Sequence, residues 1–288
     1  MRRERNRRRS FCLGKIGMAA LLAAGLSASA VVAHADSLVI LGAGQIGTWI
    51  TSGFVANPNS SQTDVRVAPS PVIATLVPCS PPATCPYYDI SLPALGSASL
   101  PFSFSGFQFG TVYVTQMNPN ASGQKLPVVQ AILSDQFFCM SGDDPFPHHQ
   151  SAETPVVPLS KLIAADLSTL NFPGVRPVPE AIRNSLVSNL VIGNIQRADG
   201  VAGEDLPLLL ELFDQDGHLV GSTSFTLSYG ETRVIGDIAG LFGIGPVGFL
   251  DGQLRVTRTS GKALMWGILY SLNSEVGVSV TTGVNLSP

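Results

Sequence analysis

The clearest alternation of apolar and polar positions lies in residues 206–227, and it predicts a β-hairpin. The first arm, Leu206–Phe213, is short and apolar, with a proline only near its start, where a missing N–H disturbs a strand ladder least. Asp216-Gly217 supplies the positive φ angles that a tight turn needs. In the return arm, Leu219–Leu227, an apolar face resumes at every second position from Phe225.

Most of the remaining chain consists of similar short runs, separated by Gly, Pro and small polar residues. This pattern predicts an all-β protein with one or two short helices. We expect two pairs of neighbouring runs to form hairpins: 110–117 with 126–133, and 252–258 with 263–272. Apolar spacing predicts a short helix in 159–170, and 237–242 fits a short helix or a turn. Further strands are expected at 37–41, 48–57, 63–68, 72–77, 89–92, 98–104 and 186–194.

The two halves of the chain share blocks in the same order. Gly110–Thr115 matches Gly252–Thr257, and in each half a polar turn and then an apolar run follow. Upstream, Ser52–Asn57 is similar to Ser188–Asn194. We therefore predict two tandem antiparallel β-sandwich modules, 36–170 and 184–288. The linker is placed at 171–183, because residues 171–179 contain three prolines and a glycine.

The second half also resembles a family. Asn189–Asn194, the run Leu208–Gly221, Gly230-Glu231-Thr232 and Gly252–Val256 are similar to the repeated module of secreted bacterial tandem β-sandwich (immunoglobulin-like) proteins. In that group a strand ending in Asn is followed by an ELFDxDGxLVG hairpin, a GxT turn and a GxLRV strand. The resemblance covers residues 184–275 well and 37–135 poorly. It implies a fold and an extracytoplasmic compartment, and no catalytic residues.

Residues 1–35 have the pattern of an export signal. A basic segment with six arginines precedes the apolar run Gly17–Val32, and Ala33-His34-Ala35 is a cleavage motif. Arg8-Arg9-Ser10-Phe11 also resembles a twin-arginine signal, so the general secretory route and the twin-arginine route both stay open. We expect a periplasmic or secreted protein that begins at Asp36.

Removal of this segment changes the charge of the chain. Ten basic and 19 acidic residues remain, which gives a formal net charge of about −9. Nucleic acid is excluded as a partner because phosphate binding needs clustered Lys and Arg. The later sequence has no apolar run long enough to span a membrane. The partner stays open, with a protein or a glycan at the cell surface as the expected classes.

Three cysteines remain in the expected mature chain. Cys79 and Cys85 bracket five residues between two prolines, and this spacing suggests a disulfide that closes a small loop in an oxidising compartment. Two free thiols or a metal site are the weaker alternatives. Cys139 follows two phenylalanines and is expected to be a buried, inert side chain.

One glycine-rich segment has the spacing of a dinucleotide-binding motif. Gly42-Ala43-Gly44-Gln45-Ile46-Gly47 follows a strand-like run, as that motif requires. The next residues, Thr48–Val55, are β-branched and contain a glycine, whereas the motif needs a helix there. We therefore interpret Gly42–Gly47 as a loop between strands and expect no cofactor. An exported nicotinamide-dependent oxidoreductase remains the enzymatic alternative, beside a hydrolase without a recognisable motif.

Two groups of residues have the side chains of metal ligands. Asp143, Asp144, His148 and His149 lie in an irregular, proline-containing stretch, for which a solvated loop is the favoured interpretation. Asp214 and Asp216 resemble the start of a calcium loop. The acidic ligand expected later in such a loop is missing, and turn chemistry explains these residues.

Trp49 and Trp266, one in each half, are expected to be core residues rather than a sugar-binding platform. The sequence thus predicts a secreted, non-enzymatic β-sandwich protein with a structural, adhesive or binding role. A carbohydrate-binding module is a further alternative.

Overall fold

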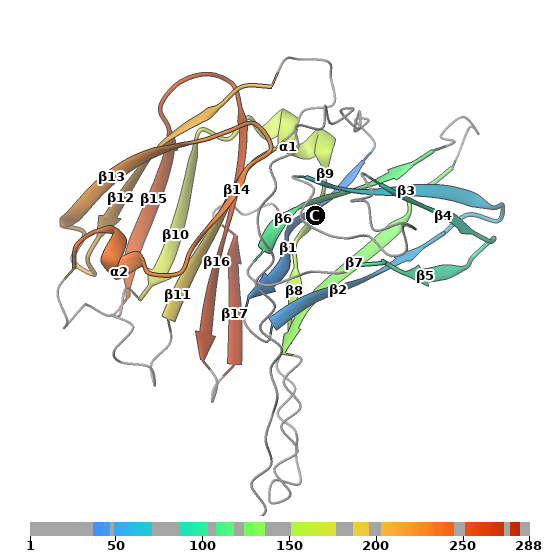
Figure 1. The fold of residues 1–288 in the computed structure, drawn as a ribbon, viewed down its shortest axis with the longest axis horizontal. Helices are drawn as coiled ribbons and strands as arrows, with labels where there is room; N and C mark the ends of the chain where they lie inside the picture. Colours follow the sequence, from blue (N-terminus) through green and yellow to red (C-terminus); the bar gives the residue numbers. More distant parts are fainter. Residues whose placement is uncertain are drawn as a thin grey trace, which may run out of the picture. The chain divides into compact units, whose positions relative to one another are not determined.

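The computed structural model describes residues 37–46, 49–70, 87–102, 108–117, 124–135, 151–176, 187–195, 203–244, 251–273 and 277–282. These ranges form an all-β fold with sandwich-like sheets and two short helices, as the sequence predicts (Figure 1). The first half contains strands β1 (Leu38–Ile46), β2 (Trp49–Ala56), β3 (Thr63–Ser70), β4 (Tyr88–Leu92), β5 (Ser97–Ser99), β6 (Gln108–Gln116), β7 (Val128–Asp135), β8 (Ser151–Thr154) and β9 (Val156–Pro158), followed by helix α1 (Leu159–Ala165). The second half contains β10 (Thr169–Val175), β11 (Val187–Ile195), β12 (Leu206–Phe213), β13 (Leu219–Leu227), β14 (Thr232–Ile235), α2 (Ile238–Leu241), β15 (Gly252–Arg258), β16 (Leu264–Asn273) and β17 (Gly277–Thr282).

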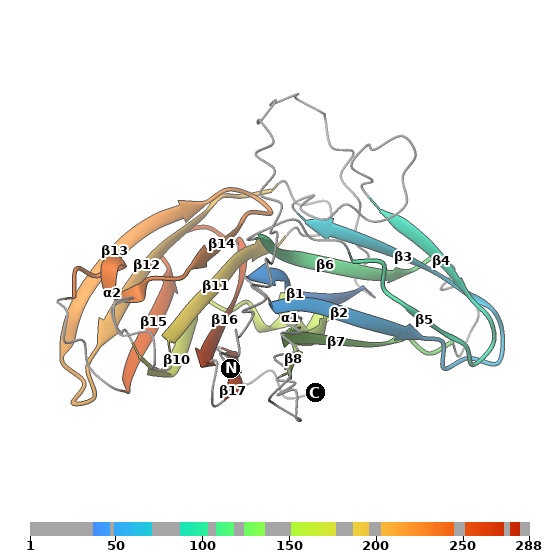
Figure 2. The ribbon, with the colours of Figure 1, turned by 60° about the horizontal axis from the view of Figure 1, so that its bottom comes forward.

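The second half is a sandwich of two four-stranded antiparallel sheets, in the orders β10-β15-β12-β13 and β14-β11-β16-β17 (Figure 2). In β12, Leu206, Leu208, Leu210 and Leu212 are buried while the residues between them are half-exposed. These leucines form one hydrophobic core with side chains of the opposite sheet, among them Leu190, Ile192 and Leu269. The period-two pattern of the sequence therefore corresponds to burial on one face of this sheet.

The strands of the first half belong to one nine-stranded sheet, with the path β4-β3-β6-β1-β2-β7-β8. Its two parts are joined where β1 pairs with β2 at Gln45–Ile50 and Ile46–Trp49. A separate core of small and medium apolar side chains fills the first half, including Ile40, Val65 and Val114.

Most strand pairings of the two halves correspond, although the pairings of β1 with β2 and with β9 have no counterpart in the second half. The order β1-β6-β3-β4 in the first half corresponds to β10-β15-β12-β13 in the second. Likewise β5-β2-β7-β8 corresponds to β14-β11-β16-β17. The sequence blocks that looked alike lie on corresponding strands: β2 and β11, β6 and β15, β7 and β16.

A third hydrophobic core contains side chains from both halves. Val39, Tyr113 and Leu159 of the first half pack with Trp266 and Tyr270 of β16. In β16, Met265 and Leu269 contribute to the core of the second sandwich, so this strand is buried on both faces. That explains why residues 263–270 read as an uninterrupted apolar run rather than an alternating one.

The structure corrects three expectations from the sequence. The hairpins expected for 110–117 with 126–133 and for 252–258 with 263–272 do not form. In the first half, β6 pairs with β1 and β3, whereas β7 pairs with β2 and β8. In the second half, β15 pairs with β10 and β12, whereas β16 pairs with β11 and β17. The linker prediction is wrong for residues 171–175, which form most of β10 and bury Phe172. Pro173 is tolerated there because β10 is an edge strand with a register shift next to it.

The third correction concerns the glycine-rich segment. Residues 42–46, expected in a loop, belong to β1, where the ladder to β6 shifts register between Ile40 and Ala43. Gly42 has a φ of 72° at this irregularity, a conformation that favours glycine. The helix expected in 159–170 is present as α1, although it ends at Ala165 and residues 169–170 already belong to β10. The short helix expected at 237–242 and the hairpin of β12 and β13 are confirmed.

Several predictions concern residues outside the described ranges. These are the export signal, the pair Cys79 and Cys85, Cys139, and the group Asp143, Asp144, His148 and His149. Among the helices that the structure describes, none has the length and apolar character required to cross a membrane.

Candidate functional site

The turn between β12 and β13 brings together three side chains that can bind a cation. One ligand atom from each of Asp214, Asp216 and His218 lies within 4.8 Å of the others. The turn forms because Oδ1 of Asp214 accepts hydrogen bonds from the backbone N–H groups of Asp216 (2.9 Å) and His218 (2.8 Å). Gly217, with a φ of 83°, completes the reversal of the chain.

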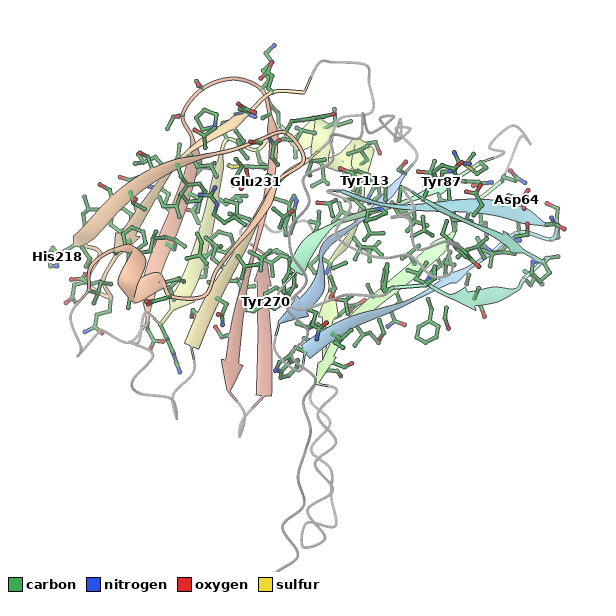
Figure 3. All side chains as sticks on the ribbon, viewed as in Figure 1. Asp64, Tyr87, Tyr113, His218, Glu231 and Tyr270 are labelled. Carbon is green, nitrogen blue, oxygen red and sulfur yellow. The ribbon has the colours of Figure 1, made fainter. Side chains whose placement is uncertain are left out.

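This geometry fits a turn better than a metal centre. The hydrogen bond from the His218 backbone is the main cause that lowers the pKa of Asp214, and Oδ2 lies 3.4 Å from Nδ1 of His218. His218 is 79% exposed at the tip of the hairpin (Figure 3). One oxygen of Asp214 is thus already used by the backbone, and the remaining ligands are solvated. The interpretation of these residues as turn formers agrees with this geometry.

The second polar cluster lies at the corner where β11 ends. The amide of Asn194 donates to three backbone carbonyls: Glu204 (2.8 Å), Ser228 (3.2 Å) and Leu227 (3.4 Å). Asn194 is buried, and its side chain therefore ties the end of β11 to the segments that flank the hairpin of β12 and β13. Its Oδ1 has no partner among the described residues.

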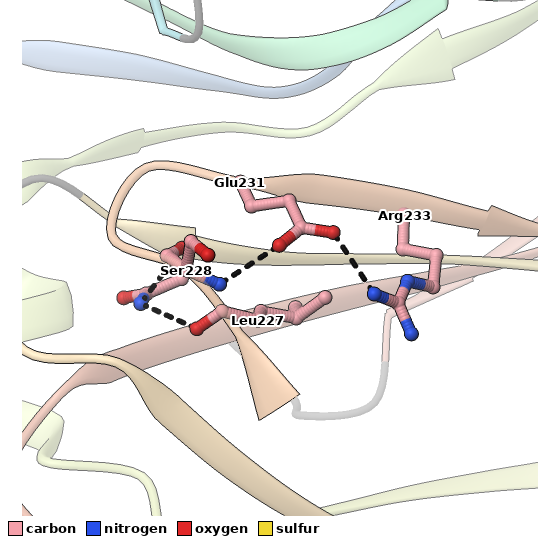
Figure 4. Close-up of polar contacts among 5 residues, drawn as sticks. Leu227, Ser228, Glu231 and Arg233 are labelled. Carbon is pink, nitrogen blue, oxygen red and sulfur yellow. Dashed lines mark hydrogen bonds and ion pairs between the residues drawn. The ribbon is translucent and has the colours of Figure 1, made fainter. Parts of the chain in front are cut away.

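Glu231 extends this corner toward the surface (Figure 4). One carboxylate oxygen accepts from the backbone N–H of Ser228 at 2.8 Å, and the other lies 3.0 Å from the guanidinium of Arg233. That guanidinium lies 4.4 Å from the ring centroid of Phe225 on β13. The turn 228–231 is therefore fixed at both ends, by Asn194 inside and by Glu231 outside.

The first half has the same corner around Asn57. Its amide donates to the carbonyls of Ser61 (2.7 Å), Pro93 (2.9 Å) and Leu92 (3.4 Å). The backbone N–H of Asn57 donates to Gly96, as that of Asn194 does to Glu231. These two asparagines are the structural residues that the sequence analysis missed. The available signal was their matching position at the end of the similar blocks 52–57 and 188–194.

The core shared by the two halves contains two polar contacts. Nε1 of Trp266 donates to the hydroxyl of Thr111 at 3.0 Å, and the hydroxyl of Tyr270 donates to the carbonyl of Gly42 at 3.3 Å. Burial raises the pKa of Tyr270, so the phenol stays protonated. A Cβ at Gly42 would lie 3.1 Å from both Tyr270 and Ile268. Close packing against β16 is therefore a structural reason for this glycine.

The predicted candidate residues do not converge on one site. Within the described part of the chain, Gly42–Ile46 lies in β1 and contacts the shared core, whereas the Asp214 cluster lies at a hairpin tip. The expectation for the tryptophans is confirmed, since Trp49 is 9% and Trp266 1% exposed. Both belong to the shared core and neither forms a surface platform.

Comparison of the chain with protein-family models, with curated proteins and with solved structures finds no match.

Proposed function

We propose that this chain is an exported, non-enzymatic β-sandwich protein with a structural, adhesive or binding role at or outside the cell envelope. The observation that supports this proposal is the core shared by the two halves. It couples the two sandwiches through Trp266, Tyr270 and Thr111, and it uses Gly42, the first residue of the nucleotide-like motif, as a packing position. A rigid body of this kind suits a protein that presents surfaces rather than one that closes over a substrate.

The same proposal includes the origin of the two halves and the route of export. The matching strand pairings and the paired asparagine corners support a duplication of one module. The proposed protein is exported through its basic N-terminal segment, is cleaved after Ala35, and carries a local disulfide between Cys79 and Cys85. It belongs with the secreted bacterial tandem β-sandwich proteins that residues 184–275 resemble.

Export is tested by expressing the full chain with a C-terminal tag in a bacterium and fractionating the cells. We expect the product in the periplasm or medium, with a mass that starts at Asp36. R8K/R9K, which keeps the charge, distinguishes the routes, since only twin-arginine transport requires the arginine pair. Uncleaved protein confined to the cytoplasm would contradict the proposal. Non-reducing mass spectrometry of the exported product shows whether Cys79 and Cys85 are linked.

The enzymatic alternative makes a different prediction. A dinucleotide site at Gly42–Gly47 would give saturable binding when NADH or NADPH is titrated into the purified protein, with a change in nucleotide fluorescence. We expect no such binding, because these residues are in β1 and the next described element is the strand β2 rather than a helix whose N-terminus faces a pyrophosphate. Saturable binding would replace the present proposal with an oxidoreductase.

The glycan alternative is tested at a different residue. Phe54, on β2, is 50% exposed, and Val128 on the neighbouring β7 is also exposed. Sedimentation of the protein with insoluble cell-wall polysaccharide, lost on Phe54→Ala and kept on Trp49→Phe, would support a carbohydrate-binding module.

A further inference from the structure

The sheet β10-β15-β12-β13 ends in a strand edge that lacks the usual protection. β13 pairs with β12 and with no other strand of the described residues. Its ladder is regular from Gly221 to Leu227, after a register shift near the turn. Residues 219–228 include no charged residue and no proline. A long, uncharged edge of this kind is a template for pairing with another strand.

The other edge strands carry the protection that β13 lacks. β10, on the opposite edge of the same sheet, contains Pro173 and a register shift. β4 has five residues and carries Asp89, which forms an ion pair with Arg66. β8 and β14 have only four residues each and carry Glu153 and Arg233. β17 lies against β8. β4 is the counterpart of β13 in the first half, so the contrast arises between corresponding strands.

Side chains cover the inner face of β13, so another strand can reach its backbone groups only along its free edge. The guanidinium of Arg233 lies 4.4 Å from the ring centroid of Phe225, and Phe242 lies beside Gly221. The outward side chains Ser222, Ser224 and Thr226 are small, exposed hydroxyls. Between Gly221 and Leu227, a strand approaching this edge thus meets backbone groups without a ladder partner among the described residues, beside outward side chains that are small and uncharged.

We propose that β13 pairs antiparallel with β13 of a second copy of this chain, which would join two four-stranded sheets into one. A register centred on Ser224 places Ser222 opposite Thr226 of the second copy, and Thr223 opposite Phe225. Hydroxyl pairs and a pair of aromatic and β-branched side chains are favourable cross-strand neighbours. The edge is therefore complementary to itself, as a two-fold interface requires. In an acidic chain, this neutral strand also lets two copies meet without opposing like charges.

This pairing is independent of the proposed export and of any ligand. Sedimentation velocity of the purified protein over a wide concentration range should show a monomer–dimer equilibrium. S224K should weaken dimerisation at least about tenfold, because it places two like charges opposite each other. Q253K is the matched control, since Gln253 is exposed on the central strand β15 of the same sheet. It should leave the equilibrium unchanged, and both variants should keep the wild-type circular dichroism spectrum and, at concentrations where the wild type is monomeric, its melting temperature.

Charge complementation tests the register itself. S224E alone should also be monomeric, whereas an equimolar mixture of S224K and S224E should recover a heterodimer. Hydrogen exchange gives a readout that needs no variant: the amides of residues 221–227 should gain protection as the concentration of wild-type protein rises. A wild-type protein that stays monomeric, or a dimer that S224K leaves intact, would overturn the proposal. Loss of the dimer in both variants without recovery in the mixture would overturn the Ser224-centred register.

Discussion

At the scale of single residues, the buried asparagines show how a side chain can connect segments that are far apart in the sequence. Asn194 and Asn57 each donate to three carbonyls: one acceptor precedes a pair of antiparallel strands, one is the last residue of that pair, and one follows it. The carbonyls of Ser228 and Pro93 also accept from the backbone N–H groups of Glu231 and Gly96, so each asparagine amide adds to the hydrogen bonds of a turn and ties that turn to another segment.

Asn194→Ala should therefore lower the free energy of unfolding by about 2–4 kcal/mol, because it removes three hydrogen bonds of one buried side chain at once. Asn57→Ala should have an effect of similar size. Asn171→Ala is the matched control, since Asn171 is exposed on β10, and it should change stability by no more than about 0.5 kcal/mol. Urea unfolding followed by fluorescence measures all three. Equal effects at positions 171 and 194 would show that the corner hydrogen bonds contribute nothing.

The carboxylate of Asp214 in the turn between β12 and β13 should make the stability of the protein depend on pH. The pKa of Asp214 is lowered mainly by the hydrogen bond from the His218 backbone, so the folded state favours the charged form. The stability it contributes is present above the unfolded pKa of about 4 and is lost as the pH falls through the lower, folded value. Asp214→Asn keeps an acceptor oxygen at every pH. The melting temperature of the wild type should therefore fall relative to that of the variant between pH 7 and pH 3, whereas a constant difference would contradict the assignment.

The sequence alone predicts the turn between β12 and β13, but it does not predict the hydrogen bonds of the corners around Asn57 and Asn194. Asp216-Gly217 identifies the turn because its donors, acceptors and positive φ all lie within five consecutive residues. The acceptors of Asn194 lie up to 34 residues away, and no local pattern specifies them. The asparagine occurs at the same position in the similar blocks of both halves. This repetition indicates a shared structural position, but it does not indicate which carbonyls the amide contacts.

At the scale of elements, the sequence predicts strands better than their partners. Alternation fixes which face of β12 is buried, and the short turn Asp214–His218 fixes its pairing with β13. The expected hairpin of β6 and β7 fails because the two strands lie in different parts of the nine-stranded sheet, β6 beside β3 and β7 beside β2. Both arrangements produce the same succession of apolar runs, so local patterning does not distinguish a hairpin from a connection between strands that do not pair.

Burial on alternate positions of β12 gives an element-scale prediction. Leu210→Ala should destabilise the protein by about 2–5 kcal/mol, since the fully buried side chain leaves a cavity in the core of the second sandwich. Leu209→Ala, one residue earlier on the half-exposed face, should cost roughly 1 kcal/mol. Thermal unfolding of the two variants provides the comparison, and a reversed order would mean that β12 presents its other face to the core.

At the scale of the whole described chain, the strand β16 determines how the halves are coupled. Its alternate residues enter two different cores, so a side chain of the second sandwich packs directly on the first. The sequence showed that residues 263–270 are apolar, but an apolar run alone does not say what covers its second face. The polar pair Trp266 and Thr111 marks that second face, because a buried indole N–H needs an acceptor and here finds it in the other half.

This coupling is measurable through a double-mutant cycle. Thr111→Val keeps the shape of the side chain and leaves the N–H of Trp266 without an acceptor, so it should cost about 1–3 kcal/mol. In a Trp266→Phe background, where there is no N–H to satisfy, the same change at position 111 should cost close to nothing. Hydrogen exchange shows which strands the substitution destabilises. Thr111→Val should speed amide exchange in both β6 and β16, which belong to different halves. If the cost of Thr111→Val is equal in the two backgrounds, or if only β6 responds, the shared core does not link the stability of the two sandwiches.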